Sequence, residues 1–209
     1  MEREGTGSGV GTEGGVGMEG GVGFTHPTGP RALLDACVLY PTVLREMLLG
    51  CAGEGLYRPL WSERILEEWA RAAARLGPGQ EAIARGEVAV ARARFPAAMV
   101  GPAPGIERRL WLPDAGDVHV LASAVAGSAD VIVTMNAADF PRGILAEEGL
   151  ARIDPDHFLL TLWERDRAAV DRVAAAVAAR ASHLAGEAWS PRGLMKRARL
   201  WRFAKVVAG

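Results

Sequence analysis

The sequence has few cysteines, almost no lysine and no long apolar run. Its 209 residues include two cysteines, Cys37 and Cys51, which lie fourteen positions apart without a CxxC spacing. This count argues against a disulfide framework or a zinc site and favours reduced thiols. No apolar run approaches the ~18 residues that a membrane helix needs, and the N-terminus lacks the apolar core of a signal peptide. We therefore expect a soluble, cytoplasmic protein without a membrane partner.

A large excess of charge of either sign is also missing. The formal net charge is −1, so the whole protein does not attract nucleic acid, and any such binding must come from a local patch. Hydrophobic residues make up 49% of the chain. That share is enough for one domain with a sizeable core and a small appendage.

Glycine dominates the first thirty residues, which contain the near-repeats "TEGGVG" and "MEGGVG". A phosphate-binding loop is a poor interpretation, because no GK[ST] follows the glycines and no strand precedes them. Such a segment cannot bury enough surface to offset the entropy of ordering it. We predict that residues 1–30 form a disordered tail.

From residue 31 onward, short apolar segments alternate with helical patterns. We expect strands at 32–35, at 56–62, near Met99 and at 130–134, and helices at 41–49, 62–76, 80–95 and 117–126. Ser62 is the expected N-cap of its helix and Gly127 the expected C-terminal cap of another. Strands that alternate with helices predict an α/β fold with an open parallel sheet flanked by helices.

After Ile153 the pattern is helical throughout. Asp154 and Pro155 begin one long helical stretch as N-cap and first helical residue, and Ser190 and Pro191 repeat these roles further on. We predict that residues 154–209 form a helical C-terminal extension.

Acidic and amide side chains stand where the predicted strands end. Asp35 closes the first strand, and Asn136 and Asp139 follow the strand at 130–134. Asp117 lies on the apolar face of its helix and points inward at the N-terminal end. Ligands of doubly wound sheets bind at the C-terminal ends of the strands, so we expect these residues to converge with Glu68.

Carboxylates held close together repel one another and raise one another's pKa values. A hard cation relieves this repulsion, and Mg²⁺ or Mn²⁺ takes oxygen ligands. Two such ions about 3.5–4 Å apart can activate a water and stabilise a leaving oxygen in phosphodiester cleavage. The residue types therefore favour a Mg²⁺ or Mn²⁺ centre.

Structural interpretations stay open for the same residues. Asp114 could cap its helix with Asp117 in the first turn, Asn136 and Asp139 could be turn residues, and Glu68 could be a solvated helix charge. The joint pattern favours the functional interpretation.

Two neighbours of these residues carry open interpretations as well. His119 lies two residues after Asp117, which turns it away from that helical face. We interpret it as a surface histidine, with a contact to the substrate as the alternative. Thr134 could hydrogen-bond a metal-bound water or a phosphate of RNA. Alternatively, Thr134 could be present only because threonine favours the strand conformation.

Four motifs, "LLDACVLYP", "WSERILEEWAR", "DAGDVHVLASAVAGSADVIVT" and "NAADFP", resemble in order and spacing those of PIN-domain nucleases. The likeness is greatest to the VapC-like ribonuclease toxins of type II toxin–antitoxin systems. It covers about residues 31–153, and the helical tail resembles the C-terminal extension of one VapC subgroup. The resemblance implies a PIN-like sheet and a metal-dependent endoribonuclease with an RNA substrate, a cognate antitoxin partner and a homodimeric state.

The resemblance also implies roles for single residues. Asp35 matches the metal ligand of the first strand, Glu68 the helix glutamate and Asp117 the central aspartate, and Asp114 is its frequent companion. These roles make Asp35, Glu68 and Asp117 the expected catalytic residues.

The last position departs from the family pattern of Thr, any residue, Asp. Asn136 stands in that place, with Asp139 three residues on. Either Asn136 binds metal through its amide oxygen, or Asp139 reaches in directly or through water. The loss of one charge weakens a second metal more than the first.

The tail interleaves basic and aromatic residues. Basic groups neutralise phosphates and aromatics stack on bases, which makes an RNA-binding surface one interpretation of Arg197, Arg199, Trp201 and Arg202. A helix that packs a Leu194, Ala198 and Trp201 face on the domain is the other, and docking of the antitoxin is a third.

Two other functional classes can be compared with the same residues. Aspartyl-phosphate phosphatases and receiver domains need a second Asp two residues after the first or a distant Lys, but position 37 is Cys and no Lys precedes Lys196. A catalytically weak PIN fold that binds RNA or protein remains the alternative. Asn136 favours it, whereas the retained acids argue against it.

Overall fold

Five parallel strands form the centre of the computed structural model, which describes residues 29–208. Their order is β3-β2-β1-β4-β5. Leu33 pairs with Leu60 on one side and with Ile132 on the other, and all three are buried. Strands covered on both faces have such continuous apolar runs. The bounds are β1 (Arg31–Leu34), β2 (Arg58–Ser62), β3 (Met99–Val100), β4 (Val131–Val133) and β5 (Ala151–Ile153).

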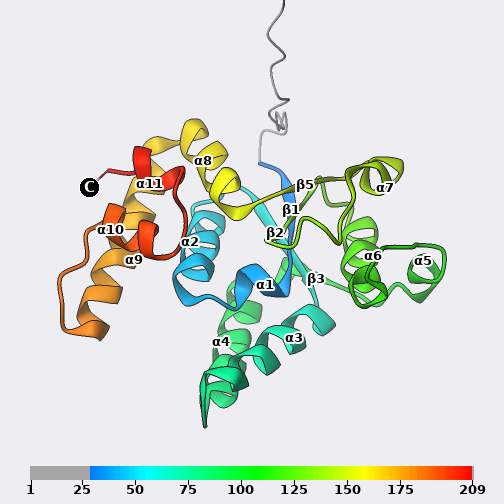
Figure 1. Cartoon of the computed structure of the whole chain (residues 1–209), viewed down its shortest axis with the longest axis horizontal. Coiled ribbons are helices and arrows are strands. Elements are labelled where there is room, and N and C mark those ends of the chain that lie inside the picture. Colours follow the sequence, from blue (N-terminus) through cyan, green and yellow to red (C-terminus); the bar gives the residue numbers. More distant parts are fainter. Residues whose placement is uncertain (1–28, 209) are drawn as a thin grey trace, which may run out of the picture.

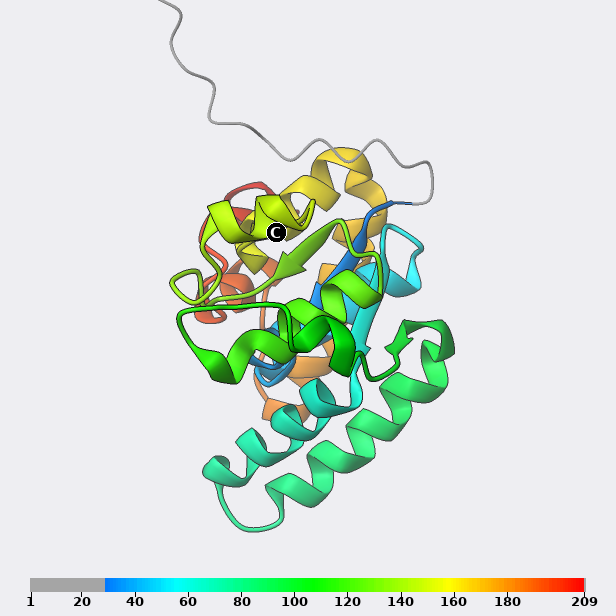
Figure 2. The same cartoon turned by 90° about the vertical axis from the view of Figure 1, so that its right-hand side faces the viewer.

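Helices cover both faces of this sheet, with α2 on one face and α6 on the other (Figure 1). Figure 2 shows α3 and α4 lying side by side and projecting away from the sheet. The predicted α/β class with a parallel sheet flanked by helices is therefore confirmed. The bounds are α1 (Ala36–Leu39), α2 (Thr42–Gly53), α3 (Glu63–Ala73), α4 (Gln80–Arg94), α5 (Pro104–Glu107), α6 (Val118–Ala126) and α7 (Arg142–Glu147).

The helical extension packs on α2 and consists of α8 (Pro155–Arg165), α9 (Arg167–Ala185), α10 (Pro191–Arg197) and α11 (Phe203–Val206) (Figure 1). The expected long helical stretch after Asp154 consists of two helices, because the chain leaves the helical conformation at Asp166 with φ −147° and ψ 89°. The Asp166 side chain accepts a hydrogen bond from Ala169 N and starts a new helix. The expected caps Asp154 and Ser190 are confirmed by side-chain bonds to the third residue after each.

The basic tail is not one amphipathic helix. Arg199 has φ 62° and separates α10 from the turn before α11. Trp201 is 58% exposed and does not pack on the domain as one interpretation required. The segment is held instead by the buried Asp156, whose carboxylate accepts the backbone N–H groups of Arg202 and Phe203 at 2.8 Å each.

The strand order reverses direction at β1. The chain runs outward from β1 to β2 and β3, then returns to β4 and β5 on the other side. The C-terminal ends of β1 and β4 therefore flank the topological switch point, where open α/β sheets bind ligands.

The N-terminal tail and the domain boundary are the remaining expectations about the organisation of the chain. The predicted disordered tail at 1–30 lies outside the described residues except for Gly29 and Pro30, and Pro30 O accepts a bond from Arg58 N. The domain boundary at 153/154 stays a prediction. None of the helices between residues 29 and 208 has the length and apolar character of a membrane span.

Candidate metal centre

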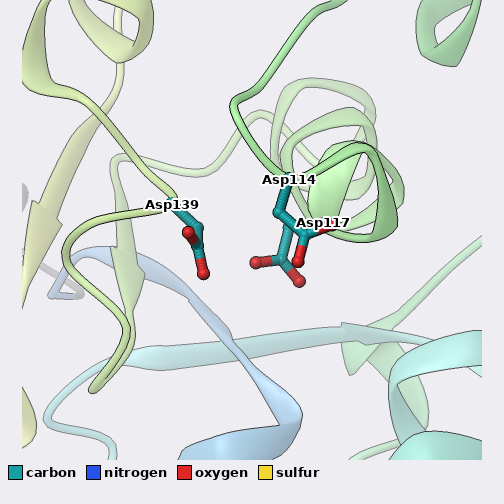
Figure 3. A group of neighbouring side chains, drawn as sticks. All are labelled: Asp114, Asp117 and Asp139. Carbon is teal, nitrogen blue, oxygen red and sulfur yellow. The ribbon is translucent and has the colours of Figure 1, made fainter.

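Three aspartates converge at the switch point. Asp114, Asp117 and Asp139 each offer one carboxylate oxygen, and these oxygens all lie within 4.8 Å of one another. Figure 3 shows Asp114 and Asp117 on the segment that enters α6, facing Asp139 on the loop after β4. Asp114 is exposed and the other two are half-buried. The cluster is thus open to a ligand from solvent.

Two of these aspartates lie in the turn that leads into α6. The Asp114 side chain accepts a 2.7 Å hydrogen bond from Gly116 N and begins the 3₁₀ turn η3 (Ala115–Asp117). Asp117 ends that turn as the N-cap of α6, without a side-chain bond to the helix. Asp114 therefore caps the 3₁₀ turn and not α6 itself, whose N-cap is Asp117, and the Asp114 carboxylate also belongs to the cluster.

The surroundings of Asp117 in the cluster raise its pKa. Burial raises the pKa of its carboxyl to about 6, with further contributions from the charges of Asp35, Asp114 and Asp139. His119 acts in the opposite direction. A carboxylate whose ionisation is opposed by burial and by three neighbouring carboxylates suits a divalent cation with oxygen ligands, such as Mg²⁺ or Mn²⁺.

Asp35 is held rigidly beside the three aspartates. It follows β1, is 8% exposed, and its Oδ2 accepts bonds from Thr134 Oγ1 at 2.7 Å and from Cys37 Sγ at 2.9 Å. Thr134 in turn accepts a bond from Asn136 N at 2.9 Å. Burial, and next the Asp35 charge, raise the pKa of the Cys37 thiol to about 12, so the thiol remains a hydrogen-bond donor. Oδ1 of Asp35 has no such partner within the described residues.

Asn136 and Asp139 are in direct contact. The side-chain amide of Asn136 donates a hydrogen bond to Oδ2 of Asp139. This bond helps to hold the Asp139 carboxylate, one of the three whose oxygens lie within 4.8 Å of one another.

Glu68 lies outside the three-aspartate group and faces two basic side chains. Its Oε1 is 3.0 Å from His119 Nε2 and 3.3 Å from Arg64 Nε. Burial raises the pKa of Glu68, but His119 and Arg64 together outweigh burial and leave that pKa below its ordinary value. Arg64 also donates to Gly116 O at 3.3 Å. Glu68 is therefore linked to the turn between Asp114 and Asp117 through Arg64.

The interpretation of His119 as a surface histidine is wrong. His119 is 5% exposed because α6 is buried over six consecutive residues, His119 to Ala124. Its Nε2 lies close to Glu68, although neither ring nitrogen makes a well-aligned hydrogen bond within the described part of the chain. A sequence signal was present, since no charged residue occurs between 118 and 126.

The structure separates the expected RNA-binding residues. Thr134 is buried at the centre of the site. The other four lie on the extension, with α10 and α11 beyond α2 and α9 on the opposite side of the sheet from α6 (Figure 1). The Arg197 guanidinium stacks 5.3 Å from the Trp189 ring centre, and Arg202 lies 3.8 Å from Asp154. The set comprises Arg197, Arg199, Trp201 and Arg202.

Comparison with known families agrees with this geometry. A family model described as "PIN domain" matches residues 31–138, which is more than half of the chain. The match includes Asp35, Asp117 and Asn136 and stops just before Asp139. The searches of curated proteins and of solved structures returned no match. The chain belongs to the PIN-domain family, whose fold is a nuclease fold that generally works with divalent metals.

Proposed function

We propose that the protein is a metal-dependent endoribonuclease that cleaves RNA phosphodiesters. The observation that carries the proposal is the convergence of Asp114, Asp117 and Asp139 within 4.8 Å at the C-terminal ends of the strands. Asp35 completes a site of four carboxylates, because its charge acts on Asp117. Asp35, Glu68 and Asp117 are the proposed catalytic residues, and the proposed metal ligands are Asp35, Glu68, Asp114, Asp117, Asn136 and Asp139.

The donor set suits Mg²⁺ or Mn²⁺ rather than a softer ion. All candidate ligands are oxygens of Asp, Glu or Asn, and no histidine or thiolate enters the three-aspartate group. A bound divalent ion supplies an activated water and stabilises a leaving oxygen. The protein supplies orientation: Thr134 and Cys37 fix one oxygen of Asp35, which leaves the other for a ligand.

We further propose that the protein is the toxin of a toxin–antitoxin pair, a homodimer that acts in the cytoplasm. Support comes from the VapC-like motifs and from the two cysteines, both free, as is usual in a reducing compartment. Trp201 and the basic residues near it are exposed, so the extension remains available to RNA or to an antitoxin.

A second candidate is a PIN fold with weak or no catalysis that binds RNA or protein. Two observations favour it. Asn136 stands in place of an acid and contacts Asp139, and the Glu68 carboxylate faces Arg64 and His119. Both reduce the negative charge available to a second metal.

The test is cleavage of a mixed RNA pool by purified protein with Mg²⁺ or Mn²⁺, with EDTA, and with the variant Asp117→Asn. Glu187→Gln is the matched control, because it also removes one carboxylate charge, but at an exposed position on the extension. We expect cleavage by the wild type and the control, and none with EDTA or in Asp117→Asn. Cleavage that survives both would contradict the proposal. A folded wild-type protein without activity would favour the binding-only alternative.

A further inference from the structure

An open cavity lies at the edge of the sheet opposite to the aspartate cluster. It has a volume of about 820 Å³ and is lined by residues at the start of β1 and β2, around the end of α2 and in the 3₁₀ turn η2 (Pro96–Ala98). A strand rises about 3.3 Å per residue, so Arg31 in the cavity is about 13 Å along the chain from Asp35. A ligand in this cavity is therefore separate from one bound at the metal centre.

Three arginines line this cavity: Arg31 of β1, Arg58 of β2 and Arg94 at the end of α4. Arg58 and Arg94 are exposed, and Arg31 is half-buried. None of the three has an ion pair with any residue between 29 and 208. The cavity therefore holds three positive charges that are accessible to a ligand from solvent.

The carboxylates that adjoin these residues bind other groups. Asp130 accepts the backbone N–H of Arg31 at 2.7 Å, not its guanidinium. Glu54, which precedes Gly55 in the cavity wall, forms an ion pair with Arg172 at 2.7 Å. The described part of the chain thus supplies no ion-pair partner for the three guanidinium groups.

Two of the arginines occupy matching positions on neighbouring strands. Arg31 of β1 pairs in register with Arg58 of the parallel strand β2. Side chains at such a pair leave the same face of the sheet, and the two strands are only about 4.8 Å apart. Like charges at paired positions repel each other and are destabilising. A bound anion would relieve this repulsion.

The third guanidinium, that of Arg94, is held in place by its neighbours. Its Cζ lies 5.1 Å from the centre of the Phe95 ring, which also lines the cavity. Its Nη2 covers Gly53 at the end of α2, where an added Cβ would collide with that nitrogen. The glycine therefore leaves room for the Arg94 guanidinium beside the cavity.

We propose that this cavity binds a phosphorylated small molecule of about nucleotide size, with its phosphates among Arg31, Arg58 and Arg94. Guanidinium groups match the geometry of phosphate oxygens and form charge-assisted hydrogen bonds with them. Most of the other lining residues are apolar or aromatic. Cavities of roughly 300–1,000 Å³ with apolar walls and a few charged groups are typical of small-molecule sites. The inference goes beyond the proposed nuclease function and does not depend on it.

The experiment is isothermal titration calorimetry of the full-length protein in EDTA, with pyrophosphate, ADP, adenosine and a short single-stranded RNA as separate probes. EDTA removes divalent ions, so no probe can bind the aspartates through a metal. The variants are Arg58→Gln, Arg58→Lys and Arg94→Gln. The matched control is Arg75→Gln in the 3₁₀ turn η1 (Ala74–Leu76), because Arg75 is also exposed and has no ion pair in the described part of the chain.

Thermal unfolding establishes that each variant is folded. Arg94→Gln removes a side chain that packs on Phe95 and covers Gly53, and could therefore disturb the fold. The exposed Arg58 at the start of its strand keeps the test decisive in that case.

We expect pyrophosphate and ADP to bind the wild type and adenosine to bind far more weakly, because the phosphates carry the affinity. Arg58→Gln and Arg94→Gln should each weaken binding of ADP by roughly tenfold, the effect of losing one charge-assisted hydrogen bond. Arg58→Lys keeps the charge and should retain part of the affinity, and Arg75→Gln should retain all of it.

Three results would overturn the inference and leave the proposed nuclease function untouched. The first is a wild-type protein that binds neither pyrophosphate nor ADP. The second is binding that is unchanged in Arg58→Gln and Arg94→Gln, or weakened equally by Arg75→Gln. The third is binding of the RNA alone, weakened in Arg58→Gln, which would assign the cavity to an RNA chain and not to a small molecule.

Discussion

Thr134 Oγ1 lies 2.7 Å from Asp35 Oδ2, although 99 positions separate the two residues in the sequence. The contact joins the end of β4 to the end of β1, the two strands that flank the switch point. It leaves one oxygen of Asp35 for a ligand and also anchors Asn136 N. This hydroxyl therefore links the core of the sheet to the loop that carries Asp139.

Replacement of Thr134 with Val tests this link. The variant keeps the side-chain shape but leaves Asp35 with only the Cys37 thiol and leaves Asn136 N without its acceptor. We expect the free energy of unfolding to fall by about 1–3 kcal/mol, the usual cost of an unpaired buried polar group, and RNA cleavage to fall with it. Thr134→Ser keeps the hydroxyl and should restore both. Urea unfolding and cleavage rates check this, and equal behaviour of Val and Ser would contradict it.

The raised pKa of Asp117 predicts a dependence of stability on pH in the absence of metal. Its pKa is about 6 in the folded protein against an ordinary 3.8, so the folded state holds the proton more tightly than the unfolded chain. The contribution of this group to stability therefore falls as pH rises from about 4 to 6, and the full penalty persists above that. Asp117→Asn removes the penalty.

Without metal at pH 7, we accordingly expect Asp117→Asn to be more stable than the wild type by roughly 1 kcal/mol, after allowance for solvent screening of a half-exposed group. The difference should vanish near pH 4. Urea titrations in EDTA at several pH values measure it. A variant that is less stable than the wild type at pH 7 would contradict the raised pKa of Asp117.

His119 should matter for both stability and activity. Its ring is buried, and its Nε2 lies 3.0 Å from Glu68. His119→Ala leaves a cavity and removes a basic neighbour of Glu68, so we expect a loss of about 2–3 kcal/mol in unfolding free energy. His119→Phe refills the space without a basic group. If His119 positions Glu68, the Phe variant regains stability but not cleavage; recovery of both would assign His119 to packing alone.

The C-terminal segment depends on one buried carboxylate. Asp156 accepts two backbone N–H groups at the start of α11, and charge-assisted bonds of this kind contribute about 1.5–3 kcal/mol each. We expect Asp156→Ala to lower the unfolding free energy by about 3 kcal/mol and Asp156→Asn by less. Asp154→Ala, which removes an exposed N-cap and a 3.8 Å exposed ion pair with Arg202, should cost about 1 kcal/mol. Chemical denaturation measures these losses. Equal losses in Asp154→Ala and Asp156→Ala would contradict the claim that Asp156 holds the C-terminal segment in place.

The convergence of the acids was predictable because it follows from the strand ends. Asp35 and Asp139 come after buried apolar strands, and parallel strands bring their C-terminal ends to one edge. The position of Asp117 could be predicted on the further assumption that its helix begins at the same edge of the sheet. The capping role of Asp114 could be read locally as well, since Asp is a common N-cap.

The environment of His119 could not be derived from helical spacing. Helical spacing predicts one buried face and one exposed face. Helix α6 is covered both by the sheet and by α5, so residues off the predicted face are buried as well. The direction of the Glu68 carboxylate depends on Arg64 and His119, which only the folded chain brings together.

Strand β5 and the helix break at Asp166 are among the features that the sequence did not predict, and each has a local reason. Strand β5 has three residues, too few for a periodic pattern, and forms because β4 offers an open edge. The break at Asp166 lies among good helix formers, and only the bond from Ala169 N to its side chain reveals a cap.

Binding of Mn²⁺ to the purified protein tests the central claim most directly, because it needs neither the correct RNA nor an intact catalytic cycle. Isothermal titration or the Mn²⁺ electron paramagnetic resonance signal should show binding to the wild type and to Glu187→Gln, and loss of that binding in Asp117→Asn and Asp139→Asn. Wild-type protein that binds no Mn²⁺, or aspartate variants that bind it unchanged, would contradict a metal centre at the ends of β1 and β4.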